Sequence, residues 1–197
     1  MTDLLLLSGG IDSTALAVLC RPNVALTVDY GQRAASGEIS AARSICVELG
    51  LRHDIAHIPI GALGSGLMTG TESSPLSEHP EFWPFRNQFL LTIGAMYAVR
   101  HGLTRVLIGT VATDVRHHDG SAVFLQRASD LIREQEGGIE VLAPGLDQDS
   151  TALVRRAQVP PSVLGWTHSC HVSPLSCGQC PGCIKHSNLM EELNWNR

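Results

Sequence analysis

The chain has 197 residues, enough for one domain with a small appendage, and 44% of them are hydrophobic, which is ample for a packed core. A net charge of −5 gives no overall basic surface, so nucleic acid is not an expected partner. No apolar run reaches the roughly 18 residues of a membrane span, and no basic stretch precedes the leucines near the N-terminus, so we expect neither membrane insertion nor secretion. In the cytoplasm, the expected location, six cysteines indicate a metal site or catalysis rather than disulfides.

Strand and helix patterns alternate along the chain. Residues 4–7 ("LLLL") predict a short buried strand, and "DSTALAVL" after the glycines has the apolar spacing of a helix. Further strands are expected at 23–31, 52–60, 105–111 and 139–145, and further helices at 38–49, 86–102 and 120–137. Residues 61–80, rich in Gly, Ser, Thr and Pro, are expected to form a mobile loop. The alternation predicts an α/β fold with an open parallel sheet, right-handed crossovers and helices on both faces.

A glycine turn joins the first expected strand to the first expected helix. Backbone N–H groups in such a turn point into one concavity, to which the helix dipole adds about +0.5 charge. Ser8 and Ser13 supply hydroxyl groups, and the absent glycine side chains let a phosphate approach the backbone. The motifs G-x-G-x-x-G and G-x-x-x-x-G-K-[ST] are both absent. The turn alone is compatible with an ordinary strand-to-helix connection or with a phosphate-binding loop.

The full string of this turn resembles the SGGxDS loop of the PP-loop ATP pyrophosphatases, which have a Rossmann-type sheet. Members of that superfamily cleave ATP to AMP and pyrophosphate and adenylate an oxygen of their substrate. The resemblance implies a pyrophosphate-binding loop made of Ser8, Gly9, Gly10, Ile11, Asp12 and Ser13. Asp12 is expected to act through Mg²⁺, because a bare carboxylate beside phosphates would be repelled. Asp12 and Ser13 are therefore also candidate catalytic residues.

Three further stretches narrow the resemblance: "DYGQR" (29–33), "PFRNQ" (84–88) and "SCHVSPLSCGQCPGC" (169–183). Together with the loop, in this order and over nearly the whole chain, they resemble the 7-cyano-7-deazaguanine synthase (QueC-like) family. That family converts 7-carboxy-7-deazaguanine to its nitrile with two ATP and ammonia, on the route to queuosine-type nucleosides. The resemblance implies an ATP-dependent ligase and a homodimer. It divides the chain into an ATP-binding domain (1–165) and a zinc-binding tail (166–197).

The resemblance also assigns residues. ATP and Mg²⁺ are the implied cofactors, and the nucleotide-binding positions beyond the loop are Val28, near the adenine, Arg86, Asn87 and Gly109. Arg33 and Asp114 join the candidate catalytic residues. Packing at a helix N-terminus is the other interpretation of Arg86 and Asn87. Because the chain has no room for a glutaminase domain, free ammonia is the expected nitrogen source.

Four cysteines form a cluster near the C-terminus, separated by six, two and two residues: Cys170, Cys177, Cys180 and Cys183. Four thiolates can surround one tetrahedral Zn²⁺, which makes a closed, structural site, and the spacing matches the cysteine motif of the family. An iron–sulfur cluster is the competing interpretation, and colour would separate the two. His168, His171 and His186 are expected near the metal but not as ligands. Cys20 and Cys46 are expected to be small buried hydrophobic groups.

The chain departs from the family pattern at several positions. Ala34 stands where the family has a His, Glu38 comes one residue late, and Ser150 stands where the family has a Lys. The string after Asp114 is "VRHHDGSAVF" instead of one like Pro-Asp-Cys-Arg. Sequence drift would explain these changes. So would adenylation of a different carboxylate, for instance on a partner protein in a defence system.

Two other function classes stay open. A tRNA thiolase of the same superfamily would need a basic RNA-binding surface and a reactive thiol outside the metal site, which the acidic composition disfavours. A non-enzymatic zinc-ribbon interaction module would leave the intact phosphate loop without a purpose, and no Lys/Arg cluster flanks the tail. Release of pyrophosphate from ATP would separate an enzyme from a module.

Overall fold

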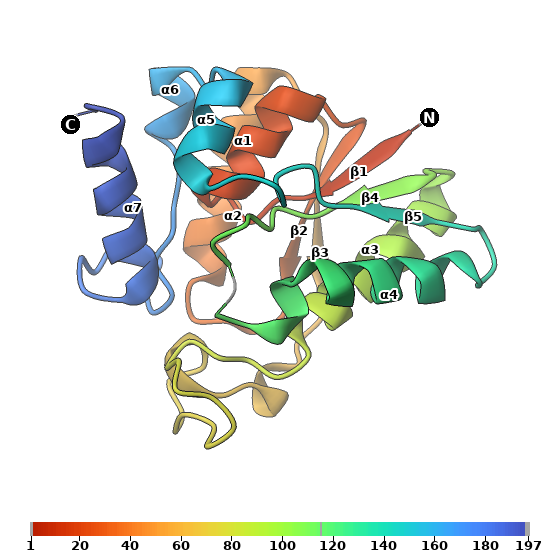
Figure 1. The fold of residues 1–197 in the computed structure, drawn as a ribbon, viewed down its shortest axis with the longest axis horizontal. Helices are drawn as coiled ribbons and strands as arrows, with labels where there is room; N and C mark the ends of the chain where they lie inside the picture. Colours follow the sequence, from red (N-terminus) through yellow and green to blue (C-terminus); the bar gives the residue numbers. More distant parts are fainter. Residues whose placement is uncertain (1, 115, 196–197) are drawn as a thin grey trace.

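The computed structural model describes residues 2–114 and 116–195. In that part of the chain, one five-stranded sheet has the order β3-β2-β1-β4-β5 (Figure 1). Its strands are β1 (Asp3–Leu6), β2 (Val24–Asp29), β3 (His53–His57), β4 (Arg105–Leu107) and β5 (Glu140–Leu142). All neighbouring strands pair in parallel. The predicted α/β fold with a parallel sheet is therefore confirmed.

Helices cover both faces of the sheet (Figure 1). One face carries α1 (Ile11–Cys20), α2 (Ala35–Leu49), α5 (Ser150–Ala157), α6 (Pro161–Leu164) and α7 (Pro181–Glu192), and the other carries α3 (Arg86–His101) and α4 (Ala122–Arg133). Because successive strand residues point to opposite faces, Leu5 packs into the first core and Leu4 and Leu6 into the second. None of the described helices is long and apolar enough to cross a lipid bilayer.

Several expected element boundaries are wrong. The helix expected at 38–49 begins at Ala35, the helix expected at 120–137 is the shorter α4, and the strands are shorter than their apolar runs. The helices α5 and α6 were not expected; both are short, and α5 is capped by Asp149, whose side chain accepts from Ala152 N–H at 2.7 Å. Short amphipathic helices give little periodicity for a sequence pattern to show.

The segment 61–80, expected to be a mobile loop, is held to its surroundings. It contains the short 3₁₀ turns η1 (Gly61–Leu63) and η2 (Gly66–Met68). The backbone N–H of Leu67 donates to Pro80 C=O at 2.8 Å, and Met68 is buried in the second core. The composition of this segment therefore predicted the lack of long elements correctly but not the packing.

The C-terminal segment contacts the rest of the fold through α7. Leu189 and Met190 of α7 are buried in the first core. The division into 1–165 and 166–197 stays a prediction, and residues 1, 196 and 197 at its outer limits lie outside the described residues, as does Val115 in the string after Asp114.

The strand order decides where a ligand can bind. The chain leaves β1 on one side towards β2 and later returns to its other side as β4, so the connections diverge between β1 and β4. In open parallel sheets, ligands bind at the carboxyl ends of the strands beside such a point. The glycine turn, Gly9 and Gly10, follows the carboxyl end of β1.

Candidate active site

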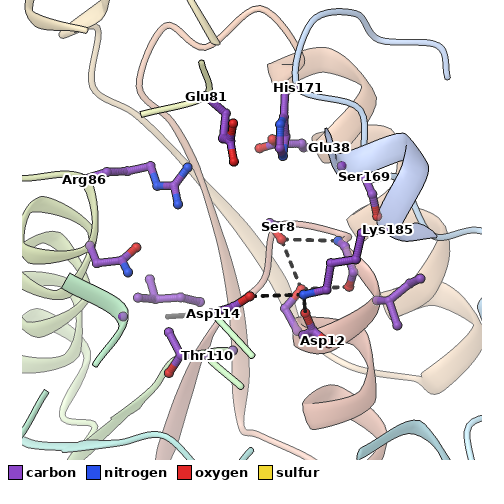
Figure 2. A pocket seen from close by; sticks show the side chains of 18 of the residues that line it. Ser8, Asp12, Glu38, Glu81, Arg86, Thr110, Asp114, Ser169, His171 and Lys185 are labelled. Atoms are coloured by element: carbon purple, nitrogen blue, oxygen red, sulfur yellow. Dashed lines mark hydrogen bonds and ion pairs between the residues drawn. The ribbon is translucent and has the colours of Figure 1, made fainter. Parts of the chain in front are cut away.

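A cavity of about 520 Å³ opens at the carboxyl ends of β1, β2 and β4 (Figure 2). Most of the predicted site residues line it: Ser8, Gly10, Ile11, Asp12, Ser13, Val28, Arg86, Asn87, Gly109 and Asp114. The fold therefore gathers into one cavity residues from both halves of the chain. Gly9 and Arg33 are the two predicted residues that do not line it.

Gly9 lies behind the loop and shapes it. Its φ is +76°, a backbone conformation that favours glycine, and a Cβ there would lie 2.9 Å from the Glu38 carbonyl oxygen and 2.8 Å from the Ala41 Cβ. No other residue would let the loop lie this close to α2. Gly9 therefore serves the loop by its backbone and not by lining the cavity.

Arg33 lies outside the cavity walls. Arg33 is exposed. Its backbone N–H donates to Met68 C=O at 2.8 Å, and its side chain lies beside Gly70. The geometry gives Arg33 no contact with the other predicted catalytic residues, and its catalytic role stays a prediction.

Backbone N–H groups at the start of α1 are free to bind an anion. No side chain caps this helix, and the first N–H groups of any helix lack an acceptor within it. The Ser13 hydroxyl donates to Gly10 C=O at 3.1 Å, while Ser8 Oγ accepts from Gly10 N–H at 3.2 Å, and these bonds order the turn. Gly109 lets the end of β4 approach, since a Cβ there would lie 3.0 Å from Ser13 N. This arrangement suits a phosphate group.

Arg86 and Asn87 at the start of α3 fit both of their interpretations. The backbone N–H of Asn87 donates to Asp119 Oδ2 at 3.0 Å and its side-chain amide donates to Asp119 C=O at 3.1 Å, which ties α3 to η3 (His118–Gly120). Both residues also line the cavity, and Figure 2 shows Arg86 reaching into it. Packing of the helix terminus thus presents these side chains to the cavity.

Several buried polar atoms of the residues that line the cavity lack partners. Among the described residues, the buried side-chain N and O atoms without a hydrogen bond belong to residues that all line this one cavity: Asp12 Oδ1, Glu81 Oε2, Thr110 Oγ1, His117 Nδ1, Ser150 Oγ and His171 Nδ1. A buried polar group left unpaired costs about 1–3 kcal/mol, and such groups gathered in one place indicate the position of a polar ligand. This cavity is therefore the candidate active site.

Two carboxylates and one ammonium meet beside the loop. Lys185 of α7 places Nζ 3.0 Å from Asp12 Oδ2 and 3.1 Å from Asp114 Oδ1, as Figure 2 shows. Burial acts to lower the pKa of Lys185, but the two carboxylates raise it overall, so the ammonium stays charged. Asp12 Oδ1 is left without a partner. Carboxylate oxygens are the ligands that Mg²⁺ prefers, so Asp12 and Asp114 fit this ion.

The far end of the cavity holds a second charged group. Glu81, 4% exposed, lies 3.1 Å from Arg116 Nη2 and 3.8 Å from His117 Nε2. Burial acts to raise the pKa of Glu81, but nearby His117, a hydrogen bond from its own backbone and the charge of Arg116 lower it to about 2. Burial and the charge of Arg86 lower the pKa of His171 to about 4. Figure 2 shows Glu81 and His171 at the end away from Asp12, where the Glu81 carboxylate and the neutral imidazole of His171 can form hydrogen bonds with a ligand.

Four further residues line the cavity that were not predicted from the sequence: Glu81, Thr110, His117 and Lys185. Thr110 follows Gly109 at the end of β4, so its place at a strand end was a usable signal. Lys185 is the only lysine of the chain, and this feature of the composition could have indicated it. Glu81 had no local signal, because the segment before α3 has no regular periodicity.

The four clustered cysteines lie together, as their spacing predicted. Their Sγ atoms are all within 4.8 Å of one another, and Cys177 Sγ lies 3.8 Å from Cys183 Sγ. Tetrahedral Zn–S bonds of about 2.3 Å require S···S distances near 3.8 Å. Backbone N–H groups of Gln179 and Cys180 lower the pKa of the Cys177 thiol to about 6. None of these thiols forms a disulfide, so the four could bind zinc.

Two of the three histidines near the cluster have side-chain partners outside it. His168 Nε2 lies 3.1 Å from Ser173 C=O, and His186 Nδ1 lies 3.1 Å from Ser169 Oγ. His171 contributes its backbone N–H, which donates to Cys180 Sγ at 3.4 Å. Four cysteine sulfurs are the number that a tetrahedral zinc site needs, so the assignment of the histidines as non-ligands stays a prediction.

The remaining two cysteines lie apart from the cluster. Burial raises the pKa of both Cys20 and Cys46, the latter to about 11. Both pack into or against the first core. They behave as the small hydrophobic groups that were expected.

The family model for queuosine biosynthesis protein QueC matches residues 2–194. The chain belongs to this family. It is 29% identical to 7-cyano-7-deazaguanine synthase 1 of Desulfitobacterium hafniense, with 95% of this chain and 90% of the relative covered. It is 31% identical to the 7-cyano-7-deazaguanine synthase of Desulforudis audaxviator, covering 93% of both chains, and 25% identical to that of Methanosarcina mazei, covering 98% and 95%. The family resemblance drawn from the motifs is thus confirmed.

The departures from the family pattern fall at different places in the structure. Ala34 is fully buried and does not line the cavity. Ser150 lines it with an unpartnered hydroxyl at the start of α5, and Glu38 lines it from α2. Position 150 therefore faces the cavity of this chain, whereas position 34 does not.

Proposed function

We propose that this protein is an ATP-dependent ligase that converts 7-carboxy-7-deazaguanine and ammonia into 7-cyano-7-deazaguanine. The observation that carries the proposal is the gathering of the buried unpartnered polar atoms around one cavity that also holds the uncapped start of α1. Family membership over nearly the whole chain supports the same chemistry.

The loop and its neighbours would hold the triphosphate. The N–H groups at the start of α1 bind the β- and γ-phosphates, and Val28 lies where β2 can contact the adenine. Asp12 and Asp114 would hold Mg²⁺, which neutralises charge on the phosphates when bound. Thr110 and Ser150 also present hydroxyl groups to the cavity, and Figure 2 shows Arg86 reaching into it.

The reaction has two adenylation steps. A carboxylate oxygen of the substrate attacks the α-phosphorus, the bond to the bridging oxygen breaks, and pyrophosphate leaves. Ammonia then attacks the acyl carbon, AMP leaves with the carboxylate oxygen, and a proton is released to give the amide. The amide oxygen is adenylated in turn, and loss of AMP and protons leaves the nitrile. The balance is one acid, one ammonia and two ATP to one nitrile, two AMP and two pyrophosphate.

The cysteine cluster would hold a structural Zn²⁺ outside this chemistry. All four ligands come from the protein, which leaves no open position for a substrate. The ion would fix the turn that precedes α7. We further propose a cytoplasmic homodimer that uses free ammonia.

Oxygen labelling tests the reaction directly. The acid labelled with ¹⁸O in its carboxylate is mixed with ATP, Mg²⁺, ammonium and the full-length protein, and the products are weighed by mass spectrometry. Each of the two AMP molecules per nitrile should contain one labelled oxygen. Unlabelled AMP would mean simple hydrolysis of ATP and would overturn the proposal.

A second candidate is the same adenylation on a different carboxylate, such as one on a partner protein. One observation favours it: the far end of the cavity combines Glu81, Arg116 and His117, so it holds a specific set of charges and hydrogen-bonding groups. The altered Ser150 lines the same cavity.

A further inference from the structure

Lys185 stands apart from every other basic residue of the chain. It is the only lysine, and the other thirteen Lys/Arg positions are all arginines. Arginine presents a planar fork, whereas lysine presents a compact ammonium with three donors that can follow a moving charge. A chain that otherwise uses arginine throughout has its one ammonium in the candidate active site.

The fold brings Lys185 to the phosphate loop from the far end of the sequence. Its Nζ lies 3.0 Å from Asp12 Oδ2 and 3.1 Å from Asp114 Oδ1. The side chain is 45% exposed and lines the cavity. It therefore faces the part of the cavity where the phosphates would bind, and its ammonium pairs with the two carboxylates of the cavity wall.

The helix that carries Lys185 is anchored on both sides of this residue. Cys180 caps α7 and accepts from Cys183 N–H, and both belong to the four-cysteine cluster. Leu189, four residues after Lys185 and on the same helix face, is buried in the first core. The backbone of Lys185 is thus fixed, and only its side chain can move.

We propose that Lys185 is a catalytic residue that binds the departing pyrophosphate of ATP. The inference rests on the proposed function. In the free protein the ammonium offsets the repulsion between Asp12 and Asp114, the pair that fits Mg²⁺. With Mg²⁺ held by Asp12 and Asp114, the ammonium of Lys185 would be free to bind phosphate oxygens of the nucleotide.

Charge explains why the reaction needs this ammonium. Breaking the bond between the α- and β-phosphates leaves negative charge on the pyrophosphate, and a fixed cation stabilises that charge. Ser150 lines the same cavity with an unpartnered and uncharged hydroxyl, and Lys185 of α7 brings a cation to it.

Amine-selective acetylation tests binding without relying on turnover. Because the chain has one lysine, the full-length, metal-loaded protein gives one labelled internal peptide, which mass spectrometry separates from the N-terminal amine. Inorganic pyrophosphate with Mg²⁺ should slow acetylation of Lys185 at least about fivefold, and sulfate at the same concentration should not. Equal rates with and without pyrophosphate would overturn the proposal.

Exchange of labelled pyrophosphate into ATP, with 7-carboxy-7-deazaguanine present, tests catalysis. Lys185→Met should lower exchange about a hundredfold, Lys185→Arg should restore part of it, and Arg127→Met, which removes an exposed cation on α4, should leave it unchanged. Unfolding midpoints show that each variant is folded. Wild-type exchange in Lys185→Met would sink this inference alone. A wild-type protein whose Lys185 is protected but which supports no exchange would overturn the proposed function and keep Lys185 as a pyrophosphate contact.

Discussion

The side-chain amide of Gln32 donates a hydrogen bond to Glu38 Oε2 at 2.8 Å, at the wall of the active-site cavity. Burial raises the pKa of Glu38 to about 7, and the bond from Gln32 and the charge of Arg86 only partly oppose it. A carboxyl group that titrates near neutrality in the folded protein, but about 2 to 3 pH units lower in the unfolded chain, links stability to pH.

Glu38→Gln should therefore stabilise the protein at neutral pH and above. Below about pH 4.5 the Glu38 carboxyl is protonated in both the folded and the unfolded wild type, so the substitution does not raise the free energy of unfolding. Between about pH 4.5 and 7 only the unfolded chain ionises, and wild type loses stability as the pH rises. Above pH 7 the full penalty remains, about 2 kcal/mol after allowance for partial exposure.

Urea unfolding at pH 4.5 and pH 8 measures this difference, with the exposed Glu134→Gln as control. A free energy of unfolding that differs between wild type and Glu38→Gln by the same amount at both pH values would contradict the raised pKa.

Substitutions in the phosphate loop should lower activity without lowering stability. Asp12→Asn removes a charge that fits Mg²⁺ and binds Lys185, and it should lower pyrophosphate exchange about a hundredfold, since one charge-assisted contact in the transition state contributes roughly 3 kcal/mol. Ser13→Ala should act in the same direction. Asp130→Asn, an exposed carboxylate on α4, is the matched control. Asp12→Asn protein that exchanges at the wild-type rate would remove this loop from the mechanism.

The local signals of the sequence were sufficient for the loop and the cysteines. A buried strand followed by two glycines and a helix predicts a strand-turn-helix unit. Four cysteines within fourteen positions can be brought together by a short stretch of chain. Both were found because the residues that form each site are close in sequence.

Contacts between distant segments could not be found in this way. The pair of Asp12 and Lys185 spans 173 positions, and it depends on how α7 docks on the first core. Glu81 enters the cavity because the segment before α3 packs against the second core, where Trp83 is buried. Arg33 is the opposite case: it belongs to a recognisable motif but does not line the cavity, so its catalytic role stays a prediction.

Elemental analysis tests the metal. Purified protein should contain about one zinc per chain and show no visible absorbance, as a site of four thiolates requires. Cys180→Ser should lower stability or solubility, because loss of a structural zinc site removes on the order of 10 kcal/mol of local folding energy, while Cys20→Ser should have little effect. Iron with inorganic sulfide, or no metal at all, would overturn the zinc assignment.

Glu81 tests the far end of the cavity. Its low pKa keeps it ionised at neutral pH, so Glu81→Gln removes one negative charge and leaves Arg116 without its carboxylate partner. The value of kcat/KM for the carboxylate substrate should fall about thirtyfold, for a loss of about 2 kcal/mol, with KM for ATP unchanged. Glu78→Gln, an exposed neighbour, is the control. An equal rise in KM for ATP would place Glu81 in the nucleotide site instead.

The last prediction decides between the two substrates. With 7-carboxy-7-deazaguanine, ATP, Mg²⁺ and ammonium, the proposed function predicts the nitrile and two AMP per product. Ala34 lies outside the cavity wall, so an alanine at this position should not affect binding of this substrate directly. The protein should be active with Ser150 in place, without the substitution Ser150→Lys. A site that has lost its hydrogen-bonding partners for a substrate can reject it by about 10⁴-fold. Nitrile formation at an ordinary rate would therefore rule out the hypothesis of a different carboxylate substrate. AMP release only in the presence of a partner protein would instead rule out 7-carboxy-7-deazaguanine as the substrate.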